Sequence, residues 1–176
     1  MSSTDVFAEP LLDSDEYLEK YKKQLTKLDE KGLLPKLDLT LTYKVYSFRG
    51  SDFGAHKSIV LTTTDKHFVT VELGFMEVDG KKHIYPVTRE LHPSNKPKLE
   101  YLGTTEAKGQ DLIAKAVAAM KRFGKYFKFA KNCQDFCNMY VEAIGVKGAR
   151  RLTDCNKVEL ISMLGEIIAF LFITFK

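Results

Sequence analysis

The chain has 176 residues, of which 44% are hydrophobic and 28% are charged, and its formal net charge at pH 7 is +4. This length and composition are typical of one globular domain, and they exclude a mostly disordered chain and a multidomain protein. Basic residues outnumber acidic ones in 98–150, but they are spread along the expected helices. We therefore expect a solvated basic face and no nucleic-acid partner.

The first part of the chain is acidic, and its apolar residues recur at helical spacing over 13–31. This pattern predicts an amphipathic helix, so 1–36 are expected to form an acidic leading helix and a linker. The first residues lack the basic and then apolar pattern of a secretory signal. The chain also has an odd number of cysteines, which is typical of reduced thiols. Both features predict a cytoplasmic protein.

The next part of the chain is rich in β-branched and aromatic residues that alternate with polar ones, which predicts strands. The expected strands are 37–48, 56–63, 67–75, 76–78 and 82–87. The strands over 56–63 and 67–75 are expected to form a hairpin. Asp79 and Gly80 are a strong two-residue turn signal for a second hairpin. We therefore expect an antiparallel sheet early in the chain.

Helical periodicity follows the strands. It predicts one helix that begins at Thr104 or Thr105 and ends at Gly124, and a second helix over 133–144. A sheet followed by helices predicts an α+β fold in which an antiparallel sheet packs against helices. We expect this domain to span 37–150.

The C-terminal part, 151–176, contains the most apolar stretch of the chain. Its longest apolar run, 167–175, is far shorter than the ~20 residues that a membrane-spanning helix needs. Two alternatives follow. The segment packs on the domain, which we favour, or it is a tail that contacts a membrane surface or a partner.

Cys133 is the first candidate for chemistry. Asn132 is a favoured N-cap, which places Cys133 in the first turn of a helix, where free N–H groups and the helix dipole favour a thiolate and can stabilise an oxyanion. The alternative is a small buried apolar side chain, the usual fate of a free cysteine. A zinc site formed with Cys137 and Cys155 has only weak support from the spacing.

A nucleophilic cysteine needs a base, and His56 is the best placed of the four histidines because it lies at the start of an expected strand. A hairpin turn centred on Thr64 sets residue 60 opposite 68 and His56 opposite Glu72. Glu72 could then orient the imidazole, as the third member of a triad does. The alternative for Glu72 is an exposed strand acid.

Three features in this order resemble the circularly permuted papain-fold thiol enzymes. They are His56 at a strand start, the sequence LGTT at 102–105 opening a helix, and the sequence NCQDFC at 132–137, preceded by Tyr126. The nearest groups are the PPPDE peptidases, whose cysteine motif runs Asn-Cys-x-x-Phe, and the lecithin-retinol-acyltransferase-like and NlpC/P60 relatives. The resemblance covers about 40–150.

The resemblance implies a permuted papain-like fold of the NlpC/P60 type, with Cys133 as nucleophile and His56 as its base. The sequence departs from the pattern in two ways: Lys57 follows the histidine, and Cys137 adds a second thiol. The acyltransferase relatives also carry a histidine where Glu72 aligns.

We therefore expect a cysteine-dependent hydrolase or acyl transferase that acts through a thioester acyl-enzyme. Its substrate would be a protein or lipid acyl group, joined by an isopeptide, peptide or lipid acyl bond, and no cofactor or metal is expected. The alternative is a non-catalytic interaction module that keeps the fold and binds a protein partner or a membrane surface.

Overall fold

In the computed structural model, the described residues are 7–11, 19, 23–24, 26–28, 30–31, 39–49, 56–63, 67–91, 99–127 and 132–147. Most of the helix expected over 13–31 lies outside these residues. So does the whole C-terminal segment 151–176, together with its two alternative roles. Among the described residues, we find no helix with the length and hydropathy of a membrane span.

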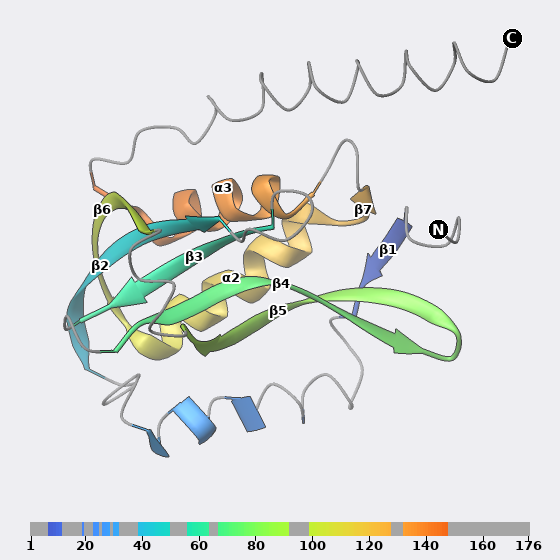
Figure 1. The fold of residues 1–176 in the computed structure, drawn as a ribbon, viewed down its shortest axis with the longest axis horizontal. Coiled ribbons are helices and arrows are strands. Elements are labelled where there is room, and N and C mark those ends of the chain that lie inside the picture. The colour runs from blue at the N-terminus through green and yellow to red at the C-terminus, as the bar shows by residue number, and fades with distance from the viewer. Residues whose placement is uncertain are drawn as a thin grey trace, which may run out of the picture.

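Seven strands form one sheet in the order β6-β2-β3-β4-β5-β1-β7 (Figure 1). The strands are β1 (Phe7–Pro10), β2 (Thr40–Arg49), β3 (Lys57–Thr62), β4 (Val69–Val78), β5 (Lys81–Glu90), β6 (Leu99–Lys108) and β7 (Tyr126–Phe127). Two helices, α2 (Gly109–Phe123) and α3 (Cys133–Ile144), follow most of the strands. The α+β class is thus confirmed.

The sheet is mixed, so the expectation of a purely antiparallel sheet is wrong. The strand β1 pairs with β5 in parallel, with Glu9 opposite His83, and with β7 in antiparallel orientation. The sequence did not indicate β1 or β7, because each is too short to show an alternating pattern.

The strands β4 and β5 form one long hairpin. Val78 pairs with Lys81 across Asp79 and Gly80, which have φ angles of 51° and 72°. The turn predicted from these two residues is confirmed, because both adopt the positive φ that a tight hairpin of this kind requires. The two segments expected on the first side of the turn are one continuous strand.

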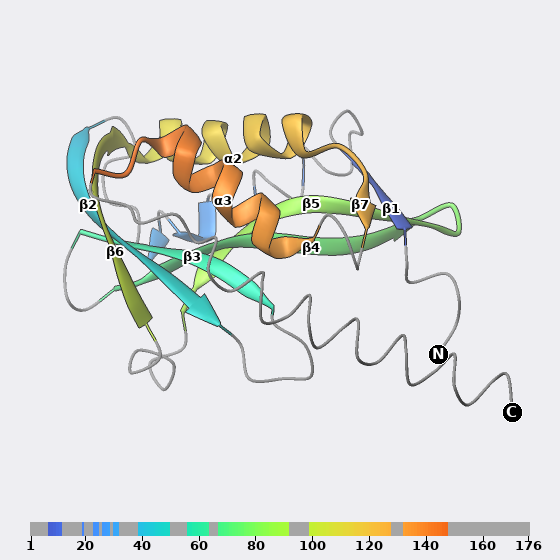
Figure 2. The same ribbon diagram turned by 90° about the horizontal axis from the view of Figure 1, so that it is seen from above.

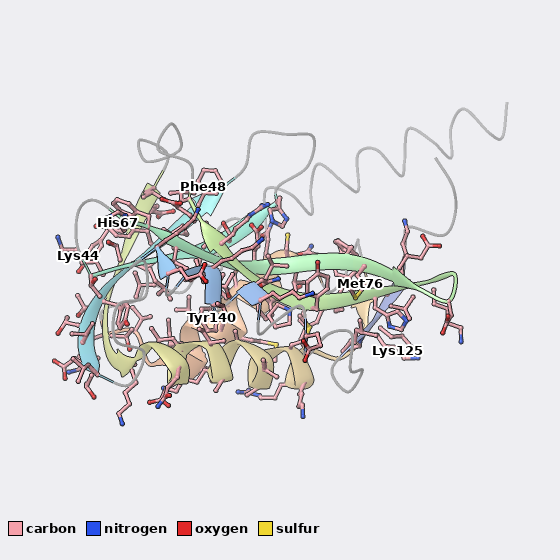
Figure 3. All side chains as sticks on the ribbon, turned by 90° about the horizontal axis from the view of Figure 1, so that it is seen from below. Lys44, Phe48, His67, Met76, Lys125 and Tyr140 are labelled. Atoms are coloured by element: carbon pink, nitrogen blue, oxygen red, sulfur yellow. The ribbon has the colours of Figure 1, made fainter. Side chains whose placement is uncertain are left out.

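Both helices lie on the same face of the sheet (Figure 2). The core between them is formed by fully buried side chains that include Phe123, Phe136 and Tyr140. Tyr140 is among the side chains that fill the space between the helices and the sheet (Figure 3), and its hydroxyl donates to the Leu112 carbonyl at 3.2 Å. Residues near the N-terminus belong to the same core, because Ala8 and Leu28 are part of this cluster.

The segment 102–105 lies within β6, so the expectation that Thr104 or Thr105 begins a helix is wrong. The helix α2 begins at Gly109 instead. The β-branched threonines favour a strand locally, and β6 pairs with β2 along its whole length, which supplies the backbone partners that a strand needs.

Candidate active site

Cys133 is the first residue of α3, as the sequence predicts. The Asn132 side chain accepts from the Gln134 N–H at 2.9 Å, and the Asp135 carboxylate accepts from the Asn132 N–H at 3.0 Å. This capping box fixes the start of the helix and confirms Asn132 as the N-cap. Cys133 itself is half-buried and lies at the positive end of the helix dipole.

The imidazole of His56 lies against the carboxylate of Glu72. Its Nε2 donates to Oε2 of Glu72 at 3.0 Å, and the side chains are 39% and 7% exposed, respectively. Glu72 is therefore buried, not the exposed strand acid that was the alternative. A buried carboxylate needs partners of this kind to offset its lost hydration.

The strand register that produces this contact differs from the expected one by two residues. Val60 pairs with Thr70, not with residue 68, because the connection between β3 and β4 is longer than a turn centred on Thr64. The Thr62 hydroxyl closes this connection by donating to the His67 carbonyl at 2.6 Å. A shift of two residues keeps every side chain on its original face, whereas a shift of one reverses all of them. His56 and Glu72 are thus diagonal neighbours, and their side chains are long enough to meet.

The side chain of Cys133 also acts on His56, which brings α3 into the site. The hydrogen bond with Cys133 and, next, that with Glu72 raise the pKa of His56 from 6.5 to about 9, against the lowering effect of burial. His56 is therefore positively charged at neutral pH. The structure thus brings together Cys133, His56 and Glu72 from three separate elements; their catalytic roles remain predictions.

Arg89 is a site residue that the sequence analysis missed. Its guanidinium forms an ion pair with Oε1 of Glu72, the oxygen that His56 does not use. The signal was present in the sequence, because the turn at Asp79 and Gly80 fixes the register of β4 and β5. That register places Arg89 opposite Thr70, diagonal to Glu72.

The second thiol of α3 has a different environment. Cys137 is fully buried, and its sulfur donates to the carbonyl oxygen of Lys57 at 3.3 Å. Burial raises the pKa of Cys137 well above its ordinary value. Because the thiolate is the reactive form of a cysteine, Cys137 is a structural thiol in the folded protein.

An aromatic pair lies at the same end of the sheet. Phe75 of β4 and Tyr126 of β7 form an edge-to-face contact with ring centroids 5.1 Å apart. The pKa of Tyr126 is raised by burial and, secondarily, by the charge of Cys133, so the phenol lies within electrostatic range of that sulfur. Tyr126 was part of the sequence pattern, whereas Phe75 was not.

The other histidines do not join this cluster. His67 is exposed at the β3–β4 connection and His83 lies on β5, while His92 is outside the described residues. Within the part of the chain that the structure describes, no group of three or more His, Cys, Asp and Glu side chains can hold a metal ion. Cys155, the third thiol of the zinc alternative, lies outside that part.

Comparisons with protein-family models, curated proteins and solved structures gave no match for this chain.

Proposed function

We propose that the protein is a cysteine-dependent hydrolase or acyl transferase in which Cys133 is the nucleophile, His56 the general acid and base, and Glu72 the residue that orients His56. The observation that carries this proposal is the hydrogen bond of His56 with the buried carboxylate of Glu72, together with the effect of Cys133 on the pKa of His56. A cysteine at a helix start, a charged imidazole and a buried carboxylate form a thiol triad by their roles.

The first half of the proposed reaction forms a thioester. The Cys133 thiolate attacks the carbonyl carbon of the substrate, and the electron pair of the C=O bond moves to the oxygen. The positive end of the α3 dipole, where Cys133 lies, is suited to stabilise this oxyanion. The intermediate then collapses, the bond to the leaving group breaks, and the His56 imidazolium gives its proton to the leaving group.

The second half releases the acyl group. Neutral His56 takes a proton from water, in a hydrolase, or from an acceptor amine or hydroxyl, in a transferase. The resulting nucleophile attacks the thioester, the C–S bond breaks, and the thiolate and imidazolium are restored. Since Nε2 of His56 is held by Glu72, Nδ1 is the ring nitrogen left to face the sulfur and the reacting groups.

A permuted papain-like fold is part of the proposal. The order of the chain supports it, because the histidine precedes the first strand of a hairpin and the cysteine begins a later helix that packs on that hairpin. The asparagine, cysteine and phenylalanine of the Asn-Cys-x-x-Phe pattern are Asn132, Cys133 and Phe136, and all three lie at the start of α3. The LGTT part of the resemblance does not support the proposal in its original form, since that segment is strand.

The test is acyl-enzyme formation with p-nitrophenyl acetate as the acyl donor. We expect a rapid burst of p-nitrophenol, an acetyl group on the peptide that contains Cys133, and slow release afterwards. Cys133→Ala and His56→Gln should each remove the burst while the circular dichroism spectrum is retained. Cys137→Ala is the matched control on the same helix and should keep the burst.

Two results would overturn the proposal. One is a burst that survives in Cys133→Ala. The other is the absence of any burst in the folded wild-type protein, combined with iodoacetamide labelling of Cys133 no faster than that of a free thiol. The second result would favour the non-catalytic interaction module.

A further inference from the structure

The carboxylate of Glu72 is shared between two cations. Oε2 accepts from His56 and Oε1 pairs with Arg89, so each oxygen has one positively charged partner. Glu72 is only 7% exposed, whereas Arg89 is 65% exposed. The carboxylate therefore depends on these two partners in place of water, while the arginine reaches it from the surface.

The charges around the imidazole alternate in sign. Cys133 of α3 and Glu72 of β4 are the charged groups that act on His56, and Arg89 of β5 reaches it through Glu72. With Cys133 as a thiolate and His56 protonated, these four groups have no net charge. Without the arginine, the same cluster would carry one negative charge next to the imidazole, which favours the protonated form of His56.

We propose that Arg89 is a positioning residue of this site, which holds one oxygen of Glu72 and so weakens the hold of Glu72 on the proton of His56. This inference rests on the proposed function in so far as it assigns His56 the task of releasing that proton to a leaving group. An imidazolium that holds its proton too tightly is a poor general acid at neutral pH. The ion pair with Arg89 thus keeps His56 able to release its proton.

The ordinary alternative is that Arg89 forms a surface ion pair with little effect, as most exposed pairs do. The next residue of β5 supplies a matched example. Glu90 is 41% exposed and pairs with Lys31 at 3.2 Å. Glu90→Gln is therefore a control for the loss of one ion pair on the same strand.

The test uses the full chain and two substitutions of Arg89. Arg89→Gln removes the charge and keeps a polar side chain, while Arg89→Lys keeps the charge. Because Arg89 is exposed and lies beside a groove on the surface, neither change opens a hole in the core. The readouts are the pH titration of the His56 ring by NMR and the pH profile of acetyl-enzyme formation.

We expect Arg89→Gln to raise the titration midpoint of His56 by about one pH unit, the effect of losing one nearby charge. The upper limb of the pH profile should move up by the same amount, and acyl transfer at neutral pH should slow. Arg89→Lys should restore both readouts, and Glu90→Gln should change neither.

A His56 midpoint that is unchanged or lowered in Arg89→Gln would overturn the inference. The NMR titration does not depend on catalysis. If the wild-type protein forms no acyl-enzyme, the proposed function fails, yet the titration still decides whether Arg89 controls the proton of His56.

Discussion

Gly103 of β6 lies beside the chain that follows α3, which pairs with this edge strand between Thr104 and Lys147, and a methyl group at Gly103 is expected to be costly to stability. Its φ angle is +145°, and a Cβ atom built on it would lie 2.2 Å from the Lys147 carbonyl oxygen and 2.9 Å from a Val146 methyl. The backbone at Lys147 is held in place, because its N–H donates to the Thr104 carbonyl at 2.9 Å. The close backbone contact leaves little room for relaxation.

The cost of Gly103→Ala has two parts. A φ angle in this region is nearly restricted to glycine and costs an alanine about 1–3 kcal/mol. Forcing a methyl group into a filled space costs about 1–3 kcal/mol more. We therefore expect the free energy of unfolding to fall by about 2–6 kcal/mol, a large part of the ~5–15 kcal/mol of a typical domain.

The assay is urea unfolding followed by circular dichroism, with Gly80→Ala as the matched control. Gly80 also has a positive φ, of +72°, but no atom lies within 4 Å of the position of its Cβ. Only the backbone term applies there, so we expect a loss of about 1–2 kcal/mol. A Gly103→Ala variant that is no less stable than Gly80→Ala would refute the reasoning, since the contact with Lys147 would then be without consequence.

Three further predictions concern the site and its support. By NMR, His56 should titrate near pH 9 and lose its positive charge as the pH rises through that value. Cys133→Ala should lower the midpoint of this titration, because the hydrogen bond with Cys133 is the largest cause of the raised pKa of His56. Cys137→Ala should lower the unfolding free energy by about 1–2 kcal/mol through a small buried cavity, but the rate at which iodoacetamide labels Cys133 should stay within about twofold of wild type. Thr105→Val should destabilise the fold by about 1–2 kcal/mol in urea unfolding. The substitution removes a buried 2.6 Å hydrogen bond from the Thr105 hydroxyl to the Ile144 carbonyl at the end of α3. An unchanged unfolding midpoint would show that this hydrogen bond does not anchor the helix.

The expected contact between His56 and Glu72 is present, although the expected register of the β3–β4 hairpin is not. The sequence placed His56 directly opposite Glu72, whereas the structure places them diagonally after a shift of two residues. The contact survived because side chains alternate with a period of two along a strand. The length of the connection, which decides the shift, depends on how the loop packs and has no simple sequence signal.

The predicted start of α2 is wrong because distant strand pairing outweighs a local helix signal. The sequence LGTT precedes a clear helical stripe, and a threonine before such a stripe is an ordinary N-cap signal. In the structure the same residues pair with β2, and the chain bulges there: Val45 pairs with Gly103 and Tyr46 with Tyr101. A local signal for a helix start was overridden by pairing with a strand some sixty residues earlier in the chain.

The sequence by itself determined the elements whose causes are local. The capping box of Asn132 and Asp135 begins α3 and places Cys133 in its first turn, and Asp79 and Gly80 make the β4–β5 turn, because in each case the required groups are within a few residues of one another. Only the tertiary structure decided that the sheet is mixed. The parallel pairing of β1 and the placement of Cys133 beside His56 join residues more than seventy positions apart. Contacts at that separation exist only after the whole sheet and its helices have packed, so no local pattern records them.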